Sequence, residues 1–296
     1  MPTNANLLAA LRKGPLVLDG ATGTELQRRG CSTELPLWSA RALLESPATV
    51  CAIHEDYWRS GAQIVVANTF RTNVRTLARA GLHSRGRELN ATAVRLAQEA
   101  RERAGACGWV AASVAPVEDC YCPERVPPND ELREEHRRML EWLLEAQPDL
   151  IWIETMNTVR EAQIAAQAAA ETGLPFAVSL APREDGRLLS GEPLSDVVAV
   201  IEPLNPLAIG VNCAPPGGIL AALRTLRAIS ERPLAAYAHI GNAEPTAGWS
   251  FSESVEPEAY RAHSRTWLQA GAAIIGGCCG TGPEHVAAVA GLVRNE

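Results

Sequence analysis

The stretch AAIIGGCCGTGPEHV, residues 272–286, reads as a buried strand, a glycine-rich turn and the start of a helix. The run AAII has no polar alternation, which is typical of a parallel strand covered on both faces. Thr281 followed by Pro283 and Glu284 has the composition of a helix beginning. Residues 272–286 are therefore predicted to form one strand–helix unit.

Similar units recur along the chain. Each has an apolar run, a polar or glycine-containing turn, and a stretch with helical periodicity. The eight apolar runs are residues 15–20, 62–70, 109–116, 149–155, 175–182, 207–213, 233–241 and 272–279. Eight such units predict an α/β fold of the (β/α)8 TIM-barrel type, formed as a single domain by residues 1–296. The open doubly wound sheet is less favoured because DGATGTE, residues 19–25, lacks the dinucleotide-binding order of glycines.

Several helix starts and one long loop can be predicted from local sequence. Ser46 precedes Pro47, Asn157 precedes a turn containing Glu161, and Thr22 with Glu25 has the spacing of a capping box. The segment DCYCPERVPPND, residues 119–130, is rich in proline and follows the third strand. We expect this loop to fold over one end of the barrel.

Bulk properties exclude several kinds of partner. The net charge is -7, and no block of lysine and arginine could follow a phosphate backbone, so no nucleic acid is expected. Residues 1–20 do not resemble a signal peptide, and no apolar run reaches the length of a membrane span. We expect a cytoplasmic protein with no membrane partner. Its eight cysteines should then be reduced and available for metal binding or catalysis.

Three cysteines occupy the positions where barrel enzymes carry their chemistry. Cys213 ends the sixth predicted strand, while Cys278 and Cys279 end the eighth, and these ends should meet at one mouth of the barrel. Adjacent strand residues point to opposite faces, so Cys278 and Cys279 can share a metal only if the chain turns there. Gly276, Gly277 and Gly280 permit such a turn. Three thiolates with an open fourth position describe a catalytic zinc site.

Simpler interpretations exist for the cysteines. Free cysteine is often a small buried hydrophobic residue, which is the interpretation we favour for Cys31, Cys51 and Cys107. Cys120 and Cys122 are too close together for an ordinary zinc knuckle. The segment GGCCGTGPEHV, residues 276–286, could instead bind a phosphate at a helix start, although this leaves the paired cysteines without a role.

The segments GVNC, residues 210–213, and GGCCGT, residues 276–281, together resemble the zinc signature of the homocysteine S-methyltransferase family. The resemblance extends along most of the chain. It includes LDGATGTEL (18–26), LWSARAL (37–43), GAQIVVANTF (61–70), SVAP (113–116) and ETM (154–156). It implies one zinc ion per chain, held by Cys213, Cys278 and Cys279, and transfer of a methyl group to homocysteine to form methionine. No catalytic residue beyond the zinc-bound substrate thiolate is implied.

The same resemblance implies roles for acidic residues at the strand ends. Asp19, Gly20 and Glu154 would bind the amino acid end of homocysteine, since a carboxylate complements an ammonium group. Asp19 could alternatively cap the following helix. Glu154 has no such alternative, because it follows the apolar run LIWI. Asn68 and Thr69 are expected to line the same mouth.

On the side of the methyl donor, the resemblance points to Trp38, whose indole face would favour a methylated cation; packing is the alternative. His239 stands in YAHIG (237–241), where many relatives have a YPNxG-like stretch, and could influence the choice of donor, reach the zinc or hydrogen-bond in the barrel. Arg71 replaces a tyrosine typical of the betaine-using branch.

We therefore expect a sulfonium methyl donor, S-methylmethionine or S-adenosylmethionine. The enzyme alternatives are betaine or another methylated compound, a corrinoid protein supplied in trans, or another thiol acceptor. The other alternative is a zinc- or thiol-binding or corrinoid-docking protein without turnover.

Overall fold

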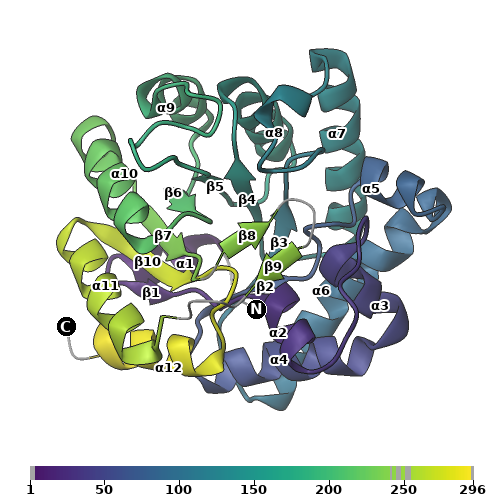
Figure 1. Ribbon diagram of the computed structural model, residues 1–296, viewed down its shortest axis with the longest axis horizontal. Coiled ribbons are helices and arrows are strands. Elements are labelled where there is room, and N and C mark those ends of the chain that lie inside the picture. Colours follow the sequence, from purple (N-terminus) through teal and green to yellow (C-terminus); the bar gives the residue numbers. More distant parts are fainter. Residues whose placement is uncertain (1–3, 241, 245–247, 251–254, 295–296) are drawn as a thin grey trace.

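The structure is a computed structural model that describes residues 4–240, 242–244, 248–250 and 255–294. Eight parallel strands form a barrel in hydrogen-bonded order β1-β10-β7-β6-β5-β4-β3-β2 (Figure 1). A parallel bridge between Leu18 and Ile64 closes the sheet between its first and last members. The predicted TIM barrel is confirmed. The strands are β1 Leu16–Val17, β2 Ile64–Ala67, β3 Trp109–Val114, β4 Leu150–Met156, β5 Phe176–Leu180, β6 Ala208–Asn212, β7 Leu234–Ala238 and β10 Ala272–Gly277.

Helices follow the strands in sequence and surround the barrel (Figure 1). The longer ones are α4 Pro47–Arg59, α6 Gly86–Arg103, α7 Asn129–Ala146, α8 Val159–Glu171, α9 Leu194–Ile201, α10 Pro216–Ile229, α11 Pro257–Gln269 and α12 Pro283–Val293. The other helices are α1 Asn4–Leu11, α2 Thr22–Arg28, α3 Ala42–Glu45 and α5 Val74–Arg79. An antiparallel pair, β8 Asn242–Glu244 and β9 Gly248–Ser250, lies between β7 and α11 in the chain. Within the described ranges, every helix is too short or too polar to cross a membrane.

Two separate apolar layers follow from strand alternation. Inside the barrel, Leu16, Ile64, Leu150 and Trp152 form one buried cluster, and Leu7 of α1 belongs to the same cluster. The alternate strand residues pack outward against the helices in a second, larger cluster. Because alternate residues of β4 up to Trp152 point inward, the next inward position is Glu154, at the end where the strand leaves the barrel.

The helix starts differ from the sequence-based predictions in three places. Thr158, rather than Asn157, caps α8, and its hydroxyl accepts the amide of Glu161. The predicted capping box is wrong, because α2 is preceded by Ala21 and the Glu25 side chain pairs with Arg28 and Arg29. Gly282, rather than Thr281, precedes α12. At Asn157 a tertiary contact competes with the local cap, because its side-chain amide donates to the carbonyl of Cys120 at 2.9 Å. At Glu25 and Thr281 the competing contacts are local, with Arg28 and Arg29 and with the carbonyl of Cys278.

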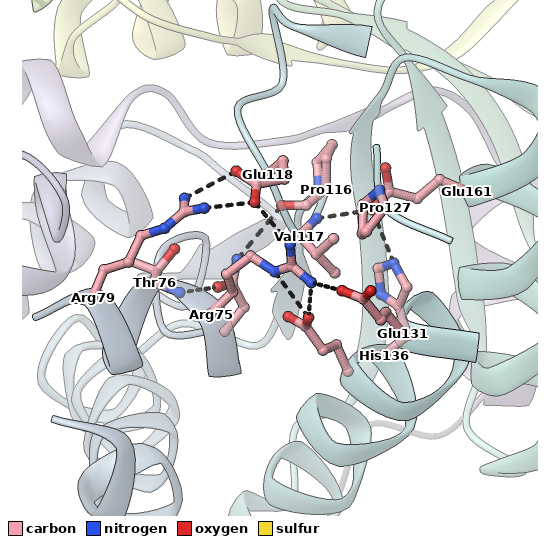
Figure 2. Close-up of polar contacts among 12 residues, drawn as sticks. Arg75, Thr76, Arg79, Pro116, Val117, Glu118, Pro127, Glu131, His136 and Glu161 are labelled. Atoms are coloured by element: carbon pink, nitrogen blue, oxygen red, sulfur yellow. Dashed lines mark hydrogen bonds and ion pairs between the residues drawn. The ribbon is translucent and has the colours of Figure 1, made fainter. Parts of the chain in front are cut away.

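The predicted loop after β3 folds over the end of the barrel and is held by charged groups (Figure 2). Glu118 lies between Arg75 and Arg79 of α5, with oxygen–nitrogen distances of 2.9 and 2.6 Å. Arg75 also contacts Glu131 and Glu135 of α7. Buried Glu161 of α8 accepts the amide of Val117 at 2.8 Å. These contacts fix the start of the loop against three helices, so that its tip, around Tyr121, is positioned over the barrel.

Candidate metal centre and active site

Three cysteine sulfurs meet at the carboxyl ends of β6 and β10. The Sγ atoms of Cys213, Cys278 and Cys279 all lie within 4.8 Å of one another. Tetrahedral zinc with bonds of about 2.3 Å places its sulfur ligands roughly 3.8 Å apart, so the cluster needs only small movements to accept such an ion. No other group of this kind occurs among the residues that the structure describes. The sequence prediction that distant segments bring these thiols together is confirmed.

The backbone turns sharply at the cysteines. Cys213 follows the end of β6 with a positive φ of 53°. Cys278 and Cys279 follow the end of β10, so the alternation of the strand no longer applies to them. Gly280 has a φ of 90°, and a Cβ there would lie 1.9 Å from the carbonyl oxygen of Ile240. Only glycine fits this turn, which allows two neighbouring cysteines to face one point.

The three thiols form an electrostatically unusual group. Hydrogen bonds from Cys213 and Cys279 hold the pKa of the Cys278 thiol well below its usual range. The pKa of Cys213 is raised, because it shares those hydrogen bonds and is buried. Cys278 is therefore the most readily ionised of the three thiols, and a divalent ion would favour ionisation of all three.

A pocket extends from the cysteines across the mouth of the barrel. The described residues that line it include three carboxylates, one guanidinium, four aromatic rings and a fourth thiol. These are Asp19, Asp119 and Glu154; Arg71; Trp38, Phe70, Tyr121 and Tyr237; and Cys120. A site that combines sulfur ligands, acidic groups and aromatic walls suits a cationic substrate with an amino group.

Asp19 faces this pocket and is not a helix cap. Its Oδ2 accepts the amide of Val66 at 2.9 Å, and the side chain is only 3 % exposed. Burial raises the pKa of Asp19 well above its usual range. Gly20 also lines the pocket, and a Cβ on it would lie 2.9 Å from the ring of Tyr57. Gly20 therefore lines the pocket with backbone alone, and Tyr57 leaves no room for a side chain at this position.

Glu154 occupies the inward position at the end of β4. It accepts hydrogen bonds from the hydroxyl of Ser113 and, at 3.3 Å, from the hydroxyl of Tyr237. The indole of Trp152 donates to Tyr237 at 2.8 Å and orients that ring. Burial raises the pKa of Glu154 to about 7, against the effect of the Ser113 hydrogen bond. A carboxyl group with this pKa gains from a cationic partner.

Backbone strain is concentrated at this mouth. Five residues other than glycine in the described ranges have a positive φ, and three of them, Trp38, Thr155 and Cys213, line the pocket. Thr155 is β-branched, so its φ of 62° is costly. Asn212 stabilises it, since its Oδ1 accepts the Thr155 amide at 3.0 Å and its Nδ2 donates to the hydroxyl at 2.8 Å. Sequence analysis missed Asn212; a polar residue inside the apolar run 207–213 was the available signal.

The remaining predicted residues divide into two groups. Asn68 and Trp38 line the pocket, and Asn68 donates to the carbonyl of Ser39 at 2.8 Å. Thr69 does not line it, contrary to expectation, because its hydroxyl points to the carbonyl of Ser113 at 2.8 Å. His239 is also outside the residues that line the pocket and outside the cysteine cluster. Gly241, the last residue of the predicted seventh strand, lies outside the described residues.

Two residues of the long loop enter the site, and sequence analysis did not assign them to it. The Tyr121 hydroxyl lies 2.9 Å from the Sγ of Cys213. Cys120 lines the pocket, and burial raises its pKa to about 12, so that its thiol stays protonated. Cys122 is not among the lining residues. Nothing in the spacing of DCYCPERVPPND predicts which residue reaches the cysteines, because the path of the loop depends on its contacts with α5, α7 and α8.

The family model for homocysteine S-methyltransferases matches residues 16–293. The chain belongs to the homocysteine S-methyltransferase family. A homocysteine S-methyltransferase of Escherichia coli K12 is 33% identical over 98% of this chain and 99% of its own. Among solved structures, the metallated form of the homocysteine methyltransferase MmuM from Escherichia coli is similar, with a TM-score of 0.84 and 31% identity over 96% of this chain and 98% of that chain. The apo form of MmuM has a TM-score of 0.74 and 29% identity over 94% and 96%.

Proposed function

We propose that this member of the homocysteine S-methyltransferase family transfers a methyl group to the thiol of homocysteine, forming methionine. We further propose that residues 1–296 form one domain holding one zinc ion through Cys213, Cys278 and Cys279. The observation that carries the proposal is the meeting of these three sulfurs within 4.8 Å, at the wall of a pocket that also contains Asp19 and Glu154.

The residues present fit zinc. Three thiolates leave one of four coordination positions for a substrate. A bound zinc ion supplies the means to ionise the homocysteine thiol, whose pKa of about 8.5 otherwise keeps it protonated at neutral pH. Cytoplasmic conditions, which keep thiols reduced, suit this chemistry, and all eight cysteines are free.

The other residues orient the reactants. Asp19 and Glu154 accept the ammonium group of homocysteine, and the backbone of Gly20 contacts the same end. The homocysteine sulfur then forms a bond to the methyl carbon while the bond from that carbon to the donor sulfur breaks. The electron pair of the broken bond stays on the donor, which becomes an uncharged thioether. Since no proton moves in this step, positioning is the main task of the protein.

The pocket walls favour a sulfonium methyl donor such as S-methylmethionine or S-adenosylmethionine. Trp38, Phe70 and Tyr121 present aromatic rings, which attract methylated cations. His239 is not among the residues that line the pocket, and it interacts instead with the backbone of Cys213 and the charge of Cys278, so we assign it no part in donor selection.

Two measurements test the proposed function. Metal analysis of the purified protein should give about one zinc per chain. Homocysteine should yield methionine with S-methylmethionine or S-adenosylmethionine, in a panel that also contains betaine and methylcobalamin. A metal-free protein with full activity would contradict the zinc proposal. No methionine from any of the four would favour a zinc- or thiol-binding protein without turnover.

Changing Tyr121 to phenylalanine should weaken zinc binding by roughly 10-fold, the usual effect of losing a hydrogen bond to a metal ligand. Once Cys213 is a thiolate, the Tyr121 hydroxyl 2.9 Å away must be the donor, and phenylalanine cannot replace it. Competition with a zinc-binding dye measures the effect. Unchanged zinc affinity in the variant would show that the contact does not support the metal.

A further inference from the structure

Arg71 lies directly after Phe70 in the segment between β2 and α5, and none of the acidic side chains that the structure describes pairs with it. Its guanidinium carbon lies 5.7 Å from the centre of the Phe70 ring. Its Nε is buried and donates to no acceptor among the described residues. The neighbouring positively charged groups on α5, Arg75 and Arg79, are each paired with the carboxylate of Glu118. A buried guanidinium nitrogen without an acceptor is costly, so its retention at a pocket calls for a ligand.

The charge of the pocket makes Arg71 distinctive. Of the described residues that line it, Arg71 alone has a guanidinium or ammonium group, whereas Asp19, Asp119 and Glu154 have carboxyl groups. Carboxylates can receive ammonium and methylated cationic groups, but they repel the carboxylate that an amino acid substrate also carries. A guanidinium is the side chain best suited to that group, because its planar array of N–H donors matches the two oxygens of a carboxylate.

The position of Arg71 favours the second substrate over homocysteine. Asp19 is almost fully buried, and both Asp19 and Glu154 lie close enough to Cys278 for its charge to raise their pKa values beyond the effect of burial. Arg71, by contrast, packs against the Phe70 ring and lies close enough to Cys120 for its charge to act on that thiol. The acidic pair therefore lies beside Cys278, and Arg71 lies beside Phe70 and Cys120 on another part of the wall.

We propose that Arg71 binds the carboxylate of the methyl donor and thereby selects donors that carry one. The inference rests on the proposed function and adds the chemical class of the donor: a methylated sulfonium or ammonium compound with a carboxylate. Asn68, three residues earlier, leaves its buried Oδ1 without a partner among the described residues and lines the same pocket, so an N–H group of an amino acid donor also finds an acceptor there. Arg71 is thus a specificity-determining residue and takes no part in bond breaking.

The test compares matched donors with and without the carboxylate. Zinc-loaded wild-type protein, Arg71→Gln and Arg71→Lys are assayed with S-methylmethionine, S-adenosylmethionine and betaine, each against its methyl ester. The control variant is Arg224→Gln, which removes an exposed guanidinium from α10 outside the pocket. For the natural donor, kcat/KM of wild-type protein and of Arg224→Gln should be about 100-fold higher with the acid than with its methyl ester. This is the range expected when one side of a buried charge pair is lost.

Arg71→Gln should abolish that preference by raising KM for the acid about 100-fold, with KM for homocysteine and the zinc content unchanged. Arg71→Lys should recover part of the preference, since a lysine keeps the charge and loses the paired N–H geometry. The same acid-to-ester ratio in wild type and Arg71→Gln would overturn the inference, and so would a rise in KM confined to homocysteine. Wild-type protein that yields no methionine from any donor would refute the proposed function instead. Unchanged KM for homocysteine shows that each variant is folded.

Discussion

Replacing Cys278 with serine is expected to remove zinc and methyl transfer together, with activity falling by more than about 100-fold. Loss of a direct ligand should exceed the 10- to 100-fold cost of losing a contact behind a ligand. Cys278 holds the lowest pKa of the three thiols because Cys213 and Cys279 donate hydrogen bonds to it, so its removal also deprives both neighbours of their acceptor. Metal content and methionine formation are measured on the same sample.

The matched control is Cys107→Ser, because Cys107 is exposed and lies outside the cluster. It should keep both zinc and activity. Equal loss in the two variants would mean that the effect of serine is general, and the assignment of Cys278 would fail. Full zinc content in Cys278→Ser would also contradict it.

Replacing Glu154 with glutamine is expected to raise KM for homocysteine by about 30- to 1,000-fold, while zinc binding changes little. Removing one member of a desolvated charge pair usually costs this much, and the amide of glutamine keeps the size but loses the charge. Steady-state kinetics and zinc titration of the same variant provide the comparison. A variant that loses zinc more than homocysteine would place Glu154 in the metal site.

The pH dependence follows from the pKa of about 7 for Glu154 in the metal-free protein. A nearby divalent cation lowers this value, so kcat/KM for homocysteine should fall as the pH drops below about 7, when the carboxyl group takes up a proton. The pH profile of Glu154→Gln should lack this decrease in kcat/KM at low pH. A decrease of the same shape in the variant would assign the titration to another group.

The stability of the ligand-free protein should depend on pH in the opposite sense to kcat/KM, decreasing as the pH rises. The pKa of Glu154 is higher in the folded protein than the ordinary value of 4.5, so between these two pH values the folded state binds more protons than the unfolded state. The ligand-free protein therefore loses stability as the pH rises through that window. At pH 8, Glu154→Gln should raise the free energy of unfolding by at most about 3 kcal/mol. Chemical denaturation at pH 5 and pH 8 measures this; a destabilised variant at pH 8 would refute the raised pKa.

Much of the barrel could be predicted because parallel strands that are buried on both faces appear in the sequence as continuous apolar runs. Each of the eight apolar runs covers a strand of the barrel, although β4 extends one residue past its run, to Met156, and β2 spans only Ile64–Ala67 of the predicted 62–70. Past the end of β2, Asn68 and Phe70 line the pocket at the mouth. The helix caps were predicted less well: Thr22 and Glu25 had the correct spacing, but ion pairs with Arg28 and Arg29 engage the Glu25 carboxylate.

Sequence alone determined the strand–helix repeat and the identity of the three metal-binding candidates, since both depend on residue types at strand ends. Tertiary structure decided which polar groups face the substrate. It separated Asn68 from Thr69 and brought Tyr121 to Cys213 across 92 residues. It also placed Arg71 in the pocket wall, where no described carboxylate pairs with it. The physical reason is that periodicity encodes which face of an element is buried, whereas the path of a loop depends on contacts between charged groups far apart in the chain.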